Sequence, residues 1–262
     1  MSTMLKVLRY ELRDVLRGRW LIAYAVFFLL LTEALLRFGG GGERALLSLM
    51  NVVLFVIPLM SLVFGTVYLY GAREFNELLL SHPVSRPQLF GGLYLGLSVP
   101  LAAAFTAGVA VPFLGRLGSA GGAATLLTLL AVGIALTFVF TAIAFVVALW
   151  LDDRAQGLGA AVLLWLMLAV VYDGFVLLLT VAFGDYPLEK PMLALMLANP
   201  LDLGRVLLLI RFDAAALMGY TGAVFARFFG TAAGALLATI ALTGWVAVPL
   251  ALGLRTFRRK DF

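Results

Sequence analysis

The chain has 262 residues, of which 63% are hydrophobic and only 13% are charged, and it contains no cysteine and one histidine. Globular proteins are about half apolar and about a quarter charged, so this composition excludes a water-soluble domain and predicts a membrane protein. The missing cysteines exclude a disulfide framework and a thiolate metal site. The chain has a net charge of +5, and its positive charge is concentrated in two tails, 1–19 and 255–262, each with a net charge of +3, so no nucleic-acid groove is expected.

Six stretches are long enough to cross the hydrocarbon layer as helices, which takes about 20 residues each. They are residues 20–36, 45–70, 91–114, 122–151, 158–183 and 230–254. The expected fold is an all-α polytopic membrane protein with a single transmembrane domain over residues 1–262. Twelve Lys and Arg lie in the short inner flanks and three in the short outer loops, so both termini are expected in the cytoplasm.

Residues 1–19 precede the first crossing and have a helical spacing of apolar side chains. Lys6, Arg9, Arg13 and Arg17 gather beside the apolar face. This pattern predicts an amphipathic helix lying on the inner membrane surface, with its basic groups toward anionic lipid headgroups. Docking of the same helix on a partner subunit is the alternative.

The first inner loop, residues 71–90, predicts a short exposed helix that ends at Pro83. Its acids are Glu74 and Glu77, and its apolar residues are Phe75, Leu78, Leu79 and Leu80. Apolar side chains on a cytoplasmic segment indicate that a partner covers them, the alternative being a plain connector. His82 stands alone here, and useful metal or catalytic sites need several converging groups, so neither role is expected.

The outer segment, residues 184–229, predicts a cap of short helices. Residues 191–198 form one helix, and Asn199 caps the next, with Pro200 in its first turn. Asp202 is placed to pair with Arg205 at i,i+3, opposite an apolar stripe formed by Leu203, Val206, Leu207 and Ile210. Residues 214–226 are too short to span and are expected to be re-entrant or to lie on the surface.

Met192 and Met196 stand one helical turn apart in this cap, with Met218 further along. Thioethers bind soft Cu(I), but methionine also fills gaps in apolar interfaces, and packing is the favoured interpretation. No metal site is therefore predicted, and Met192 and Met196 are the candidates if one exists.

Asp173 is the carboxylate that lies well inside a predicted crossing. Such a residue is a functional candidate by default. Arg205 and Arg211 are its possible partners, and a structural tie between the fifth crossing and the cap is favoured over a transport or proton role. Glu33 lies one turn from Arg37 and is expected to form a local pair.

The chain lacks the motifs of a self-sufficient enzyme. A P-loop needs a lysine followed by serine or threonine, whereas Lys6, Lys190 and Lys260 are followed by Val, Pro and Asp. A non-catalytic subunit without a cofactor of its own is expected.

The chain resembles the permease subunits of ABC transporters of the ABC-2 type. The N-terminal amphipathic helix, the six crossings, the Glu-Leu-Leu-Leu-Ser-x-Pro-Val-Ser-Arg stretch ending at Arg86 and the basic C-terminal tail carry this resemblance. Tyr172-Asp173, Asn199-Pro200-x-Asp202-x-x-Arg205 and residues 216–219 are similar to the NosY-type permeases, which serve copper supply to nitrous oxide reductase. The chain departs from that pattern at Gly204 and His82, where aromatic residues are usual.

The resemblance implies a homodimer in the bacterial or archaeal plasma (inner) membrane, bound to two cytoplasmic ABC ATPase subunits that hold ATP and Mg. The ATPase-coupling residues it implies are Glu74, Phe75, Glu77, Leu78, Leu79, Leu80 and Arg86. The outer cap would dock a periplasmic copper-handling protein. The candidate structural or functional residues near it are Asp173 in the fifth crossing and Asn199, Pro200, Asp202 and Arg205 in the cap. An ABC-2 exporter of a drug, lipid or peptide and an ATP-independent membrane scaffold are the alternatives.

Overall fold

The structure is a computed structural model that describes residues 15, 18–40, 42–72, 85–114, 116, 120–184, 186, 189–211 and 231–260. The predicted interfacial helix lies outside these residues except for Val15, Gly18 and Arg19. The loop residues 73–84 and the segment 214–226, with Met218, also lie outside them.

The described residues form helices that follow one another along the chain. They are α2 (Arg19–Phe38), α3 (Gly42–Gly71), α5 (Arg86–Phe113), α6 (Ala120–Trp150), α7 (Arg154–Leu166), η1 (Met167–Val171), α8 (Tyr172–Ala182), α9 (Glu189–Leu197), α10 (Pro200–Arg211) and α12 (Ala232–Arg259). The helices α7, η1 and α8 run on without a break and make one crossing of 29 residues. Among the described residues, six helices are long and apolar enough to cross a membrane, so the predicted all-α fold with six membrane-length helices is confirmed.

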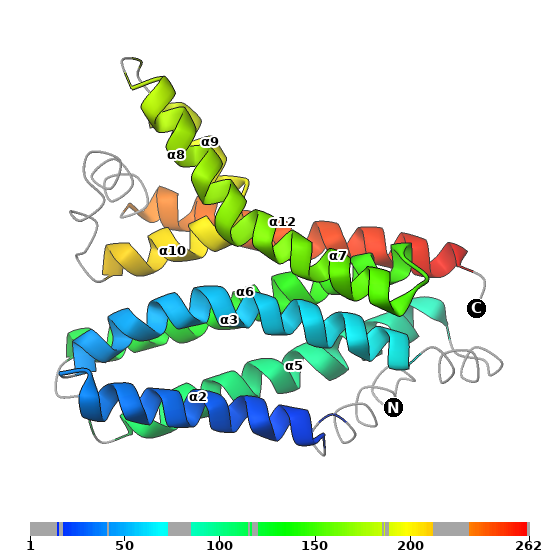
Figure 1. Cartoon of the computed structure of the whole chain (residues 1–262), viewed down its shortest axis with the longest axis horizontal. Coiled ribbons are helices and arrows are strands. Elements are labelled where there is room, and N and C mark those ends of the chain that lie inside the picture. The colour runs from blue at the N-terminus through cyan, green and yellow to red at the C-terminus, as the bar shows by residue number, and fades with distance from the viewer. Residues whose placement is uncertain are drawn as a thin grey trace.

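The most enclosed helix is α6, which packs against α3, α5 and α12 (Figure 1). In the 18-residue stretch of α6 that could lie in the membrane, 72% of the residues are buried, compared with 6% in the α7–α8 crossing and 11% in α12. The exposed side chains of α7 and α8 are largely apolar, as lipid requires. The bundle therefore has a protein-filled centre and an apolar outer surface.

Glycines let the crossings approach closely in the core. A Cβ on Gly65 of α3 would lie 2.6 Å from the Cβ of Ala144, and a Cβ on Gly108 of α5 would lie 2.7 Å from the carbonyl oxygen of Ala25. Membrane helices associate largely through van der Waals contact, so small residues at such crossings are favourable.

Several helices begin nearer the charged flanks than their apolar stretches indicate. The third crossing starts at Arg86 rather than 91, and the fifth starts at Arg154 rather than 158. Asp153 explains the second case, because its carboxylate accepts a hydrogen bond from the amide of Gln156 (2.8 Å) and caps the helix. Hydropathy marks the apolar part of a helix, whereas capping marks its end.

Two apolar clusters organise the molecule. The larger one fills the bundle of α2, α3, α5 and α6. The smaller one joins α8, α9, α10 and α12, and its buried members are Met192, Leu203, Val206 and Ala238. The predicted apolar stripe of α10 faces this smaller cluster, whereas Leu201 and Leu208 belong to the larger one. The helix α10 therefore lies between the two clusters.

In Figure 1, α8 and α9 lie side by side and lean away from the bundle, whereas α10 runs along it. At the opposite end, α3 and α6 end, α5 and α7 begin and α12 ends. We call this end the C-terminal rim, and it carries Gly71, Arg86, Trp150, Arg154 and Arg259.

Candidate functional site

The chain bends by 108° between α9 and α10, two short helices that lie between the fifth and sixth crossings. Together they are apolar enough to form a broken span or a re-entrant loop. Such a bend interrupts the helical hydrogen bonds, and in lipid each freed backbone group needs a protein partner. The polar contacts at this break therefore define the candidate site.

Two aromatic side chains from neighbouring crossings close the C-terminal end of α9. Tyr172 of α8 donates a hydrogen bond from Oη to the carbonyl of Leu195 (2.6 Å), and Trp245 of α12 donates from Nε1 to the carbonyl of Leu197 (3.0 Å). The amides of Ala198 and Asn199 are bonded to the carbonyls of Ala194 and Met196. All four carbonyls of the last turn of α9 are thus satisfied.

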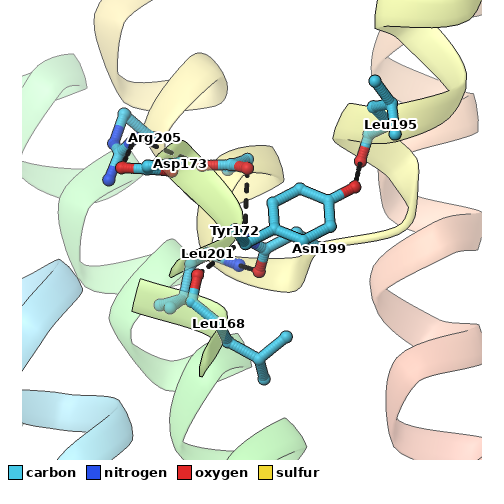
Figure 2. Close-up of polar contacts among 8 residues, drawn as sticks. Leu168, Tyr172, Asp173, Leu195, Asn199, Leu201 and Arg205 are labelled. Atoms are coloured by element: carbon cyan, nitrogen blue, oxygen red, sulfur yellow. Dashed lines mark hydrogen bonds and ion pairs between the residues drawn. The ribbon is translucent and has the colours of Figure 1, made fainter. Parts of the chain in front are cut away.

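Asn199 joins the two sides of the break (Figure 2). Its Oδ1 accepts a hydrogen bond from the amide of Leu201 (3.1 Å), and its carbonyl accepts from the amide of Leu203, so it caps α10 as predicted. Its Nδ2 donates to the carbonyl of Leu168 (2.9 Å) and to Oδ2 of Asp202 (3.1 Å). The Asn199 side chain is fully buried, and it ties α10 to the fifth crossing.

Leu168 lies in η1, a π-helical segment within the fifth crossing. The amide of Tyr172 bonds to the carbonyl of Met167, five residues earlier rather than four. Such a turn shifts the backbone pairing by one residue; π-helical turns are rare and are frequently found at functional sites. The acceptor that Asn199 uses is a carbonyl of this irregular turn.

Arg205 holds two carboxylates together beside the break (Figure 2). Its Nη1 donates to Oδ2 of Asp173 (2.8 Å) and to Oδ1 of Asp202 (3.2 Å). Asp173 is on α8 and the other two residues are on α10, so the ion pair joins two helices that are separate in sequence. Of the two arginines that the sequence allows as partners, the structure pairs Asp173 with Arg205.

The cluster of Asp173, Asp202 and Arg205 has a formal charge of −1, and Asp202 is 7% exposed. Because charges interact more strongly where water is excluded, the arginine stabilises both carboxylates and holds the helices in register. No group of three His, Cys, Asp or Glu that could hold a metal ion occurs among the described residues.

Met192 and Met196 lie in the smaller apolar cluster. Met192 is 3% exposed, and its sulfur accepts a weak hydrogen bond from Oγ1 of Thr180 (3.9 Å). Met196 packs, partly buried, against the same cluster. Both side chains fill apolar space between α8, α9, α10 and α12, which is the packing role expected of a flexible side chain.

Of the predicted coupling residues the structure describes Arg86, which is not part of this site. Arg86 lies at the C-terminal rim, where its guanidinium donates to carbonyls at the end of α12. The other coupling residues, 74–80, are outside the described part of the chain. Glu33 pairs with Arg37 (2.6 Å) as expected, and it also binds Arg116.

Sequence reasoning missed three components of the site. The hydroxyl of Tyr172, the indole of Trp245 and the π-helical turn each depend on which helices become neighbours. An aromatic N–H or O–H inside a membrane needs an acceptor, and this requirement is the signal that could have drawn attention to both side chains. This requirement does not say which backbone carbonyl accepts the hydrogen bond.

The chain is similar to known proteins along nearly its whole length. Residues 43–262 match the model of the ABC-2 family transporter protein. The chain is 30% identical over 271 residues to a protein of Pseudomonas aeruginosa named "Probable ABC transporter permease protein NosY", with 97% of each chain covered. It is 26% identical to the protein of the same name from Stutzerimonas stutzeri, with 99% of each covered. The chain, a multi-pass membrane protein, therefore belongs to the ABC-2 family of transporters.

Proposed function

We propose that this chain is the membrane-spanning subunit of an ABC transporter complex that supplies copper for the maturation of nitrous oxide reductase. Two copies would bind two ATP-hydrolysing subunits on the cytoplasmic side, and their outer helices would act on a periplasmic copper-handling protein. The observation that carries the proposal is the similarity to permeases named NosY over 97% or more of both chains.

The charge distribution supports placing the C-terminal rim in the cytoplasm. Arg86, Arg154, Arg258, Arg259 and Lys260 lie at this rim, whereas the opposite end of the bundle has Arg37, Arg44 and Arg116. Cytoplasmic flanks of membrane helices are enriched in Lys and Arg. The loop 73–84, which connects α3 to α5, leaves from this same rim and is the proposed contact with the ATPase.

The residue inventory supports placing both ATP and copper on partners. The three lysines of the chain are outside any P-loop motif, and the chain has no cysteine. In this proposal the chain transmits movement, while the ATPase binds nucleotide and the periplasmic partner binds the metal. The break between α9 and α10 would be the part of the chain that responds on the outer side.

The test is purification of the tagged chain from its native host in mild detergent. We expect an ABC ATPase and a copper-binding periplasmic protein in the complex, and ATP hydrolysis that depends on the chain. An ATPase that co-purifies without a copper protein, and whose activity rises with a drug, lipid or peptide, would favour an exporter. A complex without any ATPase would favour a scaffold.

The coupling loop is tested by placing charge at Leu78 and Leu79. Exchanging both for Glu is expected to abolish stimulation of the ATPase, because a charged pair cannot be buried in an apolar contact without a large desolvation cost. The matched control is Leu114→Glu, at a position 74% exposed at the opposite end of the bundle, which should leave stimulation unchanged. Full stimulation with Leu78→Glu and Leu79→Glu would contradict the coupling assignment.

A further inference from the structure

The C-terminal end of α12 is held by an arginine from another crossing. Nη1 of Arg86, in the first turn of α5, donates to the carbonyls of Arg258 (2.6 Å) and Lys260 (3.0 Å), with the carbonyl of Phe257 at 3.4 Å. The last carbonyls of a helix lack helical partners and carry a partial negative charge. The guanidinium therefore satisfies both the hydrogen bonding and the electrostatics of this end.

A second set of contacts binds the same end to α6. Nζ of Lys260 donates to the carbonyl of Leu149 (2.8 Å) and pairs with Asp152 (2.7 Å). The indole of Trp150 donates to Oγ1 of Thr256 (3.3 Å). The last turn of α12 is thus fixed to the start of α5 and the end of α6, all at the C-terminal rim.

The middle of α12 contacts the candidate site. Trp245 donates its indole hydrogen to the carbonyl of Leu197, the last residue of α9, two residues before Asn199. From Trp245 to Arg258 is thirteen residues, or about 20 Å along a helix. The helix α12 therefore connects the rim to the break between α9 and α10 over most of the thickness of the bilayer.

The turn between these two contacts lacks one helical hydrogen bond. Pro249 lies inside the helix, buried, and lacks the amide that would bond to the carbonyl of Trp245. Gly253, one turn later, faces the ring of Phe90 so closely that a Cβ there would lie 2.9 Å from it. The residues of α12 that follow Pro249 therefore pack against α5, and those that precede it are held at the break by Trp245.

We propose that α12 couples the C-terminal rim to the break between α9 and α10, with Arg86 and Trp245 as the positioning residues at its two contacts. A displacement of the first turn of α5 moves the end of α12 through Arg86. Trp245 passes that movement to the end of α9. This coupling is a property of the chain itself and goes beyond the identity of its cargo or its ATPase.

The test is a double-mutant cycle in the full chain, reconstituted in lipid nanodiscs and followed by backbone hydrogen exchange. Arg86→Gln is expected to raise the exchange rate of the amides of residues 198–203 by about two- to thirtyfold, the range of coupling between distant sites. In a Trp245→Phe background, Arg86→Gln should not raise the exchange rate further, because the hydrogen bond from α12 to the end of α9 is already lost.

Two controls separate coupling from general loosening. Trp165→Phe removes a matched indole bond, from Nε1 to the carbonyl of Phe55 (3.1 Å), so Arg86→Gln should keep its full effect in that background. The amides of α2, which takes no part in the hydrogen bonds of Arg86 or Trp245, should exchange at unchanged rates. Arg86→Lys retains a cationic donor and is expected to restore part of the protection.

The proposal is overturned if Arg86→Gln leaves the break unchanged, or if it raises exchange equally with Trp245 present and absent. If Arg86→Gln does not fold, Lys260→Gln loosens the same end of α12 and is expected to give the same pattern. Equal effects of Lys260→Gln in both backgrounds would then reject the coupling.

Discussion

Arg205 forms ion pairs with two carboxylates that belong to different helices, and these pairs determine what the loss of the arginine would do. Without the guanidinium, Asp173 and Asp202 would have no counter-charge, and the Asp202 side chain is only 10% exposed, compared with 36% for Asp173. Without the Asp173 charge, Arg205 and Asp202 still form a pair. The three residues are therefore unequal, although each makes an ion pair.

The prediction at this scale is an order of stability among single variants. Arg205→Leu is expected to lower the free energy of unfolding by about 3 kcal/mol or more, because it leaves the buried charge of Asp202 unpaired. Asp173→Asn is expected to cost about 1 kcal/mol, since an amide oxygen still accepts a hydrogen bond. Thermal unfolding of the purified variants in detergent measures both.

Arg116→Leu is the matched control, because it removes an arginine that also binds a carboxylate, Glu33, but is 46% exposed. An exposed pair contributes little, so its unfolding temperature should stay near that of the unmodified chain. A loss with Arg116→Leu equal to that with Arg205→Leu would show that burial is not the deciding factor.

Much of the local chemistry at the break follows from the sequence. The capping by Asn199, the pairing of Asp202 with Arg205 and the choice of Arg205 or Arg211 for Asp173 depend on spacing along one helix or on the scarcity of charges in a crossing. The bond from Asn199 to Leu168 does not, because it joins residues 31 positions apart through a turn whose irregularity leaves no mark in the composition.

At the scale of helices, Gly204 explains how α10 lies so close to the bundle. A Cβ at this position would lie 3.0 Å from a methyl group of Val132 in α6 and 3.4 Å from Leu54 in α3. An aromatic side chain, usual at this position in the NosY-type pattern, has no room here. The departure from that pattern thus coincides with a close packing contact.

Gly204→Phe is expected to push α10 away from α6 and to increase hydrogen exchange throughout α10, because the ring overfills a packed contact at a cost of about 1–3 kcal/mol or more. Gly159→Phe is the control, since nothing lies within 4 Å of a Cβ at that position in α7. Similar exchange in α10 for both variants would contradict the packing explanation.

The number and type of the crossings could be predicted because a run of about 20 apolar residues has few alternatives. Their ends could not be placed as well, because helices continue past the apolar run. Asp153 caps the fifth crossing before its apolar stretch begins, and the third crossing starts at Arg86. The direction in which α8 and α9 lean depends on packing between helices, which hydropathy does not encode.

At the scale of the whole molecule, the sidedness of the bundle rests on its basic residues and stays a prediction. The chain has no cysteine, so single cysteines can report it without background. Tyr186→Cys, at a position 68% exposed after α8, is expected to react with a membrane-impermeant thiol reagent on intact cells. Ala155→Cys, exposed at the C-terminal rim, should react only after permeabilisation. The reverse pattern would invert the proposed topology.

The π-helical turn at Met167–Val171 shifts the angular phase of the fifth crossing by one residue. Each residue of an α-helix advances by about 100°, so every side chain after Val171 faces a direction about 100° away from where an unbroken helix would place it. Asp173 meets Arg205, and Tyr172 meets Leu195, only in this shifted phase. A return of the turn to regular α-helix would rotate both side chains away from their partners at the same time. The irregular turn and the polar contacts around it would therefore be lost cooperatively.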